Sequence, residues 1–168
     1  MTPYPAYKPS GVPWLGDVPE HWDCKRLKYH APQVVDQRNY RLDGEKYVAL
    51  EHIESWTGKL IAANEEIVFE STVKAFSKGD VLFSKLRPYL AKAFVAHQNG
   101  VCVGELLVLR PKPEMLPRYL LYNLLTKSII DVINGSTYGA KMPRASWDFV
   151  GNLSFYLPPT NEQSAIVA

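Results

Sequence analysis

Short apolar runs separated by turn residues organise the first part of the chain. Residues 47–50 and 81–83 consist of aromatic and aliphatic side chains, and residues 22–29 place Trp22, Leu27 and Tyr29 among charged residues. Asp43-Gly44 precedes the second run and Ser77-Lys78-Gly79-Asp80 precedes the third, as expected where a turn leads into a strand. The pattern therefore predicts three short β-strands.

A β-hairpin is predicted for residues 93–109. Residues 93–97 and 101–109 are two β-rich runs, and Asn99-Gly100 lies between them. Asn-Gly readily adopts the left-handed backbone that a tight hairpin turn requires. Pro111 and Pro113 should end the second strand, because proline has no N–H to give to a sheet.

Helical spacing replaces the strand pattern later in the chain. Apolar side chains recur there at three- or four-residue intervals, at Leu116, Leu120 and Leu124 and then at Ile129, Ile130 and Ile133. This spacing predicts two consecutive helices, with Gly135 as the residue just after the second helix. Residues 152–157 return to a strand pattern.

The last residues predict the start of another helix. Pro158 and Pro159 end the strand, Thr160 is a suitable N-cap, and Gln163 stands at the capping-box spacing. This helix is shorter than the roughly 12–15 residues that an isolated helix needs. It leads us to expect one domain of a longer protein, cut where a long helix begins.

The predicted fold class is α+β, because strands dominate and one pair of helices interrupts them. We expect a twisted, mainly antiparallel or mixed β-sheet with a few helices packed on it, ending in the start of a long helix. A proline-rich arm packed on the domain is assigned to residues 1–20, the main domain to 21–159 and the truncated helix to 160–168. Trp14 and Leu15 are the apolar residues expected to anchor the arm.

Composition limits the possible function classes. The 168 residues are 46% hydrophobic, which is enough for one globular domain, and the net charge is only +2. Nucleic-acid binding must therefore rest on local clusters of charge. Cys24 and Cys102 are too few and too far apart for a zinc site or a disulfide framework, and both are expected to be buried thiols. No apolar run approaches the ~20 residues of a membrane span, so a cytoplasmic protein without a membrane partner is expected.

Three polar segments carry candidate DNA-contacting residues. Each contains cations, amides, hydroxyls or phenols of the kinds that bind phosphates or base edges. The candidates are Arg38, Asn39 and Tyr40 in residues 33–41; Ser84, Lys85, Arg87, Tyr89 and Lys92 in residues 83–92; and Ser136, Thr137, Tyr138, Lys141 and Arg144 in residues 134–144. From spacing alone, each segment also fits an ordinary solvated loop, so that alternative stays open.

Signatures of catalysis are mostly missing from the sequence. It contains no Gly-x-Gly-x-x-Gly, phosphate-loop or Gly-x-Ser-x-Gly pattern, and its four histidines lack metal-ligand spacing. Asp80 with Lys85 faintly resembles the carboxylate and lysine of a nuclease. No Glu-x-Lys follows, however, and Asp80 is better explained as a turn residue. We therefore expect neither catalytic residues nor metal ligands.

Three segments of the chain match a known family in order. Residues 7–22 read Tyr-Lys-Pro-Ser-Gly-Val-Pro-Trp-Leu-Gly-Asp-Val-Pro-Glu-His-Trp. Residues 79–90 read Gly-Asp-Val-Leu-Phe-Ser-Lys-Leu-Arg-Pro-Tyr-Leu, and residues 157–167 contain Leu-Pro-Pro followed by Glu-Gln and Ile-Val. They are similar to the opening, the central strand and loop, and the exit helix of one domain type. In this order, the segments resemble the target recognition domain of type I restriction–modification specificity subunits.

The resemblance implies a non-catalytic domain that binds double-stranded DNA and reads one half of a bipartite site. A full specificity subunit would carry two such domains, separated by long helices that pack as a coiled coil. With its initial Met1 and its end at the first helix, this chain would be the N-terminal of the two. Its partners would be methyltransferase (M) subunits and, through them, restriction (R) subunits. Those partners would use S-adenosylmethionine, ATP and Mg, so no cofactor is expected in this chain.

The resemblance raises the weight of the three polar segments as DNA-facing loops. Phosphate contacts are expected from Lys85, Lys92, Lys141 and Arg144, and base-edge contacts from Arg87, Arg38, Asn39 or Tyr40. Two enzymatic alternatives remain: the recognition domain of a fused restriction–methylation enzyme, or a Mg-dependent nuclease centred on Asp80. A third alternative is a protein–protein module that uses the Trp14-Leu15 arm and the truncated helix.

Overall fold

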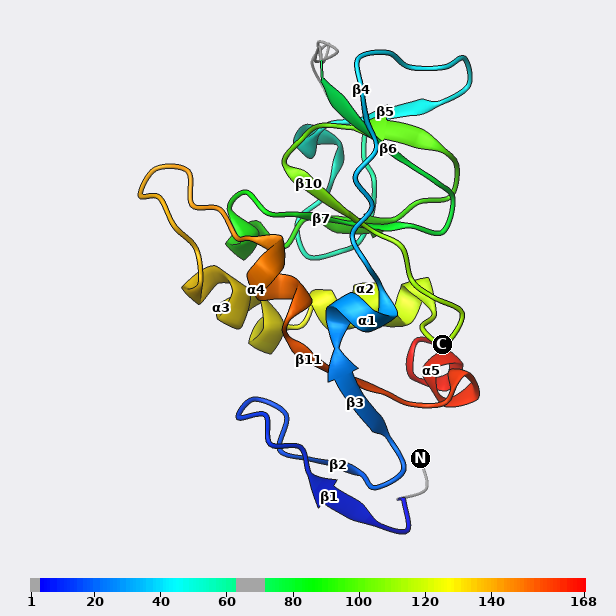
Figure 1. The fold of residues 1–168 in the computed structure, drawn as a ribbon, viewed down its shortest axis with the longest axis vertical. Coiled ribbons are helices and arrows are strands. Elements are labelled where there is room, and N and C mark those ends of the chain that lie inside the picture. Colours follow the sequence, from blue (N-terminus) through cyan, green and yellow to red (C-terminus); the bar gives the residue numbers. More distant parts are fainter. Residues whose placement is uncertain (1–3, 63–71) are drawn as a thin grey trace.

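The computed structural model describes residues 4–62 and 72–168, which form a mixed α+β fold of small sheets and short helices (Figure 1). One sheet has the order β10 (Leu106–Leu109), β7 (Val81–Ser84) and β8 (Ala93–Val95). The other large sheet has the order β4 (Gln37–Arg38), β6 (Val73–Phe76), β9 (Gly100–Cys102) and β5 (Lys46–Val48). Within these sheets only the β5–β9 pair is parallel among the described strands. The predicted fold class is confirmed.

The β10-β7-β8 sheet is buried on both faces. Val81 and Phe83 belong to the core that includes the helices, whereas Leu82 and Phe94 belong to a core shared with the four-stranded sheet. Figure 1 shows β7 and β10 between these two layers. Because successive side chains of a strand point to opposite faces, a strand between two cores is apolar at every position. This explains the continuous apolar run at residues 81–83.

The two predicted consecutive helices are confirmed as α2 (Pro117–Leu124) and α3 (Lys127–Gly135). Thr126 is the N-cap of α3, and its hydroxyl accepts a hydrogen bond from the N–H of Ile129. The prediction for Gly135 is wrong, because this residue lies inside the last turn. Ser136 follows it with a right-handed backbone and donates its Oγ hydrogen to the carbonyl of Ile133 at 2.6 Å. A hydroxyl thus satisfies the helix end, so a left-handed glycine is not needed.

The predicted hairpin at residues 93–109 is wrong. Its two strands lie in different sheets, because β8 pairs with β7 whereas β9 pairs with β5 and β6. A turn at Gly104 also divides the second run into β9 and β10. Gly100 serves close packing here, since a Cβ at this position would stand 2.3 Å from the carbonyl oxygen of Lys46.

The predicted strand at residues 22–29 is correct only in its first half. The chain forms β3 (Asp23–Arg26) and then turns into the short helix α1 (Leu27–His30). Leu27 and His30 are both buried, which is the spacing of one helical face.

The two cysteines differ in burial. Cys102 is buried, as predicted, and burial raises the pKa of its thiol to about 12. The prediction for Cys24 is wrong, because this thiol is exposed, as are all four residues of β3.

The strand predicted at residues 152–157 is confirmed as β11 (Ser154–Leu157), which pairs antiparallel with β3. A short helix that the sequence analysis missed, α4 (Trp147–Gly151), comes before it. Ser146 caps α4 by accepting the N–H of Phe149. No helix in the described part of the chain has the length and apolarity needed to cross a bilayer.

The final helix, α5 (Thr160–Ile166), begins as predicted, but its predicted capping box is wrong. Pro159 occupies the N-cap position, and Thr160 is already helical. Gln163 is fully buried and its amide joins three segments instead. It accepts a hydrogen bond from the N–H of Leu116 and donates to the carbonyls of Glu114 and Pro158, each at 2.8 Å.

The proline-rich arm contains a two-stranded sheet of β1 (Tyr7–Pro9) and β2 (Asp17–Pro19). Trp14 packs against the main core, whereas Leu15 remains exposed. Glu162 of α5 accepts a hydrogen bond from the phenol of Tyr4 in the arm at 3.4 Å. Just after the arm, it also accepts the indole N–H of Trp22 at 2.8 Å and pairs with His21. The arm and the last helix are therefore joined through one carboxylate, while the exact domain boundaries stay a prediction.

Candidate nucleic-acid interface

Residues 84–92 leave β7 as a compact protrusion. Arg87 and Ala91 both have left-handed backbones, with φ of 47° and 48°, and they flank the 3-10 turn η2 (Pro88–Leu90). Positive φ is costly for residues other than glycine, so the surrounding contacts must hold this shape. Ser84 is buried and donates to the carbonyl of Leu86 at 2.9 Å, so it shapes the protrusion from within.

Residues 136–145 join this protrusion, although 43 residues (93–135) separate the two segments. The N–H of Arg87 donates to the carbonyl of Pro143 at 2.8 Å, and the N–H of Ala145 donates to the carbonyl of Lys85 at 2.8 Å. The guanidinium of Arg87 also reaches the carbonyl of Lys141 at 3.3 Å. We call residues 84–92 and 136–145 together the joined loops. Two of the three segments predicted from the sequence therefore form one surface.

Arg144 belongs to the joined loops, but its guanidinium faces another protein side chain. Its Nε and Nη2 lie 3.0 and 2.7 Å from the Oε1 of Glu105. The hydrogen bonds to Glu105 raise the pKa of Arg144 above its ordinary value. A fork-shaped contact of this kind holds the arginine in place and neutralises it. Arg144 thus helps to build the joined loops, a function that its position in the sequence did not indicate.

The remaining cations of the joined loops have no ion-pair partner within residues 4–62 and 72–168. These cations are Lys85, Arg87, Lys92 and Lys141. The ammonium of Lys92 is held by the carbonyl of Leu50, in the 3-10 turn η1 (Leu50–His52), at 2.9 Å. Arg87 and Lys141 are exposed and Lys85 is half-buried. Three cations are therefore available to an anionic ligand.

Hydroxyl candidates in the joined loops are largely engaged with the helix before them. Ser136 and Thr137 donate their hydroxyl hydrogens to the carbonyls of Ile133 and Asn134, at 2.6 and 2.8 Å. Tyr89 and Tyr138 are exposed aromatic side chains on the two halves of the surface. The loop after α3 extends away from the body of the molecule (Figure 1). The phenols are thus better placed than the hydroxyls to meet a ligand.

A buried lysine that the sequence analysis missed lies beneath this region. Lys74 of β6 donates its ammonium hydrogen to the carbonyl of Leu106 at 3.1 Å. Burial lowers the pKa of Lys74, and the nearby charge of Lys85 lowers it further. No local signal marks this residue, because it stands in an apolar strand pattern as a single cation.

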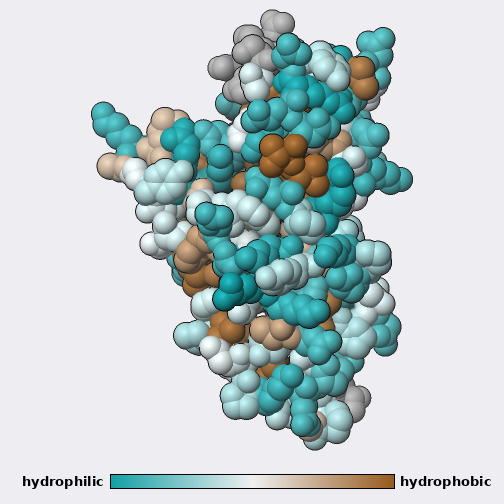
Figure 2. Space-filling model, in the orientation of Figure 1, coloured by the Kyte–Doolittle hydropathy of each residue, from teal (hydrophilic) through white to brown (hydrophobic). Residues whose placement is uncertain are grey.

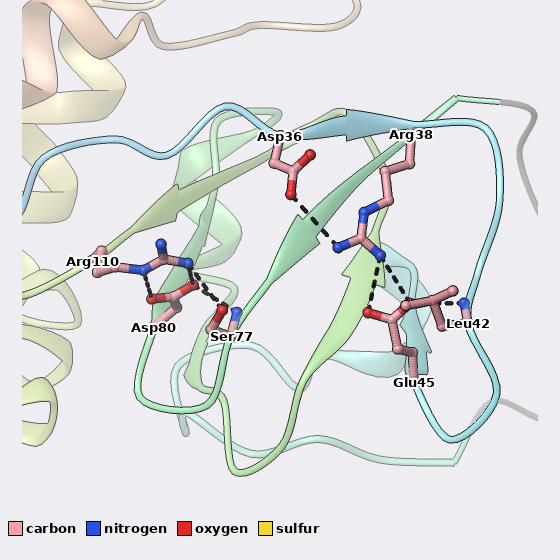
Figure 3. A network of polar contacts seen from close by, with 7 residues as sticks. All are labelled: Asp36, Arg38, Leu42, Glu45, Ser77, Asp80 and Arg110. Atoms are coloured by element: carbon pink, nitrogen blue, oxygen red, sulfur yellow. Dashed lines mark hydrogen bonds and ion pairs between the residues drawn. The ribbon is translucent and has the colours of Figure 1, made fainter.

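The third predicted segment stands apart from the joined loops. It lies at the end of the four-stranded sheet where the chain passes from β4 to β5 (Figure 1). Arg38 lies in β4, and its guanidinium contacts two carboxylates (Figure 3). Nη1 lies 3.1 and 3.2 Å from the two oxygens of Glu45, and Nη2 lies 3.6 Å from Asp36. The side chains of Arg38 and Glu45 are only 20% and 11% exposed. Arg38 therefore stabilises this segment from within.

Glu45 also closes the turn that follows β4. Its Oε1 accepts a hydrogen bond from the N–H of Leu42 at 2.8 Å, which Figure 3 shows. The turn leaves Asn39, Tyr40 and Leu42 exposed at its tip. We call residues 36–45 the β4 turn. The sequence carried one signal for Glu45, since opposite charges at Arg38 and Glu45 flank the Asp43-Gly44 turn.

Asp80 is occupied by a structural ion pair. Its carboxylate accepts hydrogen bonds from Arg110 at 2.8 and 2.9 Å and from the N–H of Ser77 at 2.8 Å (Figure 3). It is 1% exposed, and its hydrogen bond raises the pKa of Arg110. Within the described residues, no group of three or more His, Cys, Asp or Glu side chains could hold a metal ion. The geometry supports the interpretation of Asp80 as a turn residue.

Comparison with known proteins gives one family. The sequence model of the type I restriction modification DNA specificity domain matches residues 33–168. The opening segment at residues 7–22 lies before this match. The type I restriction enzyme EcoDI specificity subunit of Escherichia coli is 27% identical over 159 residues, covering 91% of this chain and 35% of that protein. The chain thus spans about a third of the length of this relative.

Solved structures share the fold. The HsdS subunit of Thermoanaerobacter tengcongensis superposes with a TM-score of 0.72 at 23% identity, over 89% of this chain and 41% of that one. A chain from a structure on complex assembly in the type I R-M system gives a TM-score of 0.63 at 19% identity, over 96% and 39% of the two chains. Both similarities concern the arrangement of the backbone.

Proposed function

Because the chain belongs to the type I restriction–modification DNA specificity domain family, we propose that it recognises a short sequence in double-stranded DNA. The observation that carries this proposal is the joined loops, where Lys85, Arg87 and Lys141 meet without carboxylate partners among the described residues. Cations that are not neutralised by the protein are free to neutralise phosphates. The sequence read would be one half of a bipartite site.

In this proposal the residues of the joined loops have different tasks. Lys85 and Lys141 contact phosphates and set the register of the domain on the duplex. Arg87 reads a base edge, because a guanidinium can form two parallel hydrogen bonds with guanine in the major groove. Glu105 and Arg144 keep the loops in shape. The hydrogen bond from the backbone N–H of Arg87 to Pro143 holds the main chain in place, which favours a defined direction of the Arg87 side chain toward a base.

The β4 turn contributes a second set of contacts. Asn39 and Tyr40 are exposed at its tip, and an asparagine side chain suits the edge of adenine. Arg38 supports the turn through Glu45 and is not assigned a base.

Specificity subunits are non-catalytic in general, and we propose the same for this chain. Methylation and cleavage would then belong to methyltransferase (M) and restriction (R) subunits, which would use S-adenosylmethionine, ATP and Mg. A cytoplasmic location is part of the same proposal. The hydrogen bonds from Arg110 and Ser77 to the Asp80 carboxylate do not support the hypothesis of a nuclease centred on Asp80.

The test uses the full-length protein assembled with its methyltransferase subunits. Methylated adenines are mapped in DNA from cells that express the system, and a split motif is the expected result. Arg87→Ala should then relax one base position, with a loss of about 1–3 kcal/mol of discrimination. Arg118→Ala is the matched control, since Arg118 is an exposed arginine on α2 whose guanidinium donates to the carbonyl of Val167 at 2.9 Å.

Two results would contradict the proposal at different levels. If Arg87→Ala leaves both motif and affinity unchanged, Arg87 is not a reader, although DNA recognition stands. If the wild-type system methylates no defined sequence, the proposed function itself is wrong.

A further inference from the structure

A second cationic surface lies outside all three segments that the sequence analysis singled out. It is an open hollow of about 560 Å³ between β3, α1 and the turn at residues 110–114. Its lining consists of Lys25, Arg26, Tyr29, Lys112 and Glu114. Figure 2 shows hydrophilic side chains gathered over β3 and α1 on this face of the molecule. We call this surface the basic hollow.

The cations of the basic hollow are not neutralised by the protein. Lys25, Arg26 and Lys112 are exposed and form no ion pair within the described residues. The guanidinium of Arg26 donates to the neutral Oδ1 of Asn152 at 3.0 Å. Three positive charges thus face one carboxylate, that of Glu114.

The carboxylate of Glu114 is itself engaged. Its own backbone N–H and the ring of His30 lower the pKa of Glu114. The Nδ1 of His30 lies 3.3 Å from its Oε1, on the buried side of the hollow. The Glu114 side chain is 44% exposed and stays negatively charged, so the hollow carries three cations and one anion and is positive in sum.

An aromatic side chain completes the surface. Tyr29 is 54% exposed, and the ammonium of Lys28 lies 5.4 Å from the centre of its ring. Lysine, arginine and tyrosine side chains are donors of the kind that contact phosphate oxygens. The chemistry of the basic hollow thus matches a polyanion.

The basic hollow is connected to the joined loops by a short rigid path. Arg26 is hydrogen-bonded to Asn152, which is the C-cap of α4. The five residues of α4 rise about 7.5 Å at ~1.5 Å per residue. Just before α4, Ala145 is hydrogen-bonded to Lys85 in the joined loops. The helix that links the two surfaces is therefore short compared with the ~34 Å of one DNA turn.

We propose that the basic hollow binds phosphates of the DNA duplex that flanks the half-site read by the loops. The proposal rests on the proposed function, since it assumes that the loops engage DNA. The flanking contact is independent of sequence, because phosphates carry no base identity. It adds affinity and sets the angle of the domain on the duplex.

The experiment compares the full-length protein with its Lys25→Gln/Lys112→Gln double variant. Binding is measured over a range of salt concentrations on a long duplex and on a duplex trimmed to the recognised motif. On the long duplex, the slope of log K against log salt should become shallower by about 1.8, from ~0.9 for each of two phosphates. On the trimmed duplex the two proteins should agree, and the ratio of specific to non-specific binding should not change.

Lys127→Gln is the matched control, since Lys127 is an exposed lysine whose charge is already paired with Asp131. Thermal unfolding of each variant checks the fold, which these surface changes should leave intact. An unchanged slope on the long duplex, with specific binding retained, overturns this proposal and leaves the proposed function standing. Absence of any sequence preference in the wild type overturns both.

Two further outcomes also overturn the proposal. If the double variant differs from the wild type on the trimmed duplex as well, the basic hollow lies on the half-site itself. If DNA binding is unchanged but assembly with the other subunits is lost, the hollow receives an acidic protein surface instead.

Discussion

The joined loops and the β4 turn both present an arginine in a polar segment, yet the two arginines do different work. Arg87 is held through its backbone, by the carbonyl of Pro143, and its guanidinium makes one long contact. Arg38 is held through its guanidinium, by Glu45 and Asp36. A loop that is closed by main-chain hydrogen bonds leaves its side chains free for a ligand. In a loop that is closed by ion pairs, the charged side chains already have partners in the protein and are not free for a ligand.

Arg144 shows that the same rule applies within the joined loops. It lies only three residues from Lys141, yet its guanidinium faces Glu105 while Lys141 is exposed. The availability of a cation is therefore a property of its partners, and residue type and loop position do not determine it.

The largest expected effect comes from removing the carboxylate that closes the β4 turn. Glu45→Ala leaves the half-buried Arg38 without its main partner and the N–H of Leu42 without an acceptor. We expect the free energy of unfolding to fall by about 2–3 kcal/mol, measured by urea denaturation. Glu45→Gln keeps an oxygen acceptor for both donors and should lose less. A loss below about 0.5 kcal/mol for Glu45→Ala would mean that this contact does not hold the turn.

Replacing Arg87 by alanine should mainly change DNA discrimination, whereas replacing Arg38 by alanine should mainly change stability. Arg87→Ala should change DNA discrimination by about 1–3 kcal/mol and stability by at most about 0.5 kcal/mol. Arg38→Ala should lower stability by about 1–2 kcal/mol, because its hydrogen bonds to Glu45 are lost. Urea denaturation and competition binding on matched and mismatched duplexes measure the two quantities. If both variants changed stability and DNA discrimination to the same extent, the joined loops and the β4 turn would not differ in this way.

A smaller effect should follow from releasing Arg144. Glu105→Gln removes the negative charge that pairs with this arginine. The freed guanidinium can then meet a phosphate, so the salt dependence of DNA binding should become steeper, by at most ~0.9 in slope. Glu20→Gln serves as the control, since Glu20 is exposed on the arm and forms no ion pair within the described residues. A slope equal to that of the wild type would show that Arg144 stays out of reach of DNA.

The smallest expected difference is between two lysines of the joined loops. Lys85→Gln should reduce the salt slope by about 0.9. Lys92→Gln should reduce it less, because the ammonium of Lys92 is fixed on the carbonyl of Leu50. DNA binding of both variants to the same duplex, measured over a range of salt concentrations, distinguishes the two lysines. A larger effect at Lys92 would reverse this assignment.

The sequence determined the elements whose cause is local. The apolar run at residues 81–83, the spacing of Leu116, Leu120 and Leu124, and the prolines after β11 gave a strand, a helix and a strand end that the structure contains. Burial of one face or of both faces leaves a period that can be read along the chain. The polar segments and the order of the family motifs were likewise readable without contacts.

The tertiary structure decided which segments meet and which charges remain free. Asn99-Gly100 had a hairpin signal, but β9 pairs with β5, because Gly100 permits a close approach to Lys46. Arg144 is paired with a glutamate thirty-nine positions away. Such partners leave no periodic trace, since strand pairing and ion pairing join residues that are distant in sequence. The sequence thus named the candidate loops, whereas only their contacts determined which of their cations could face a ligand.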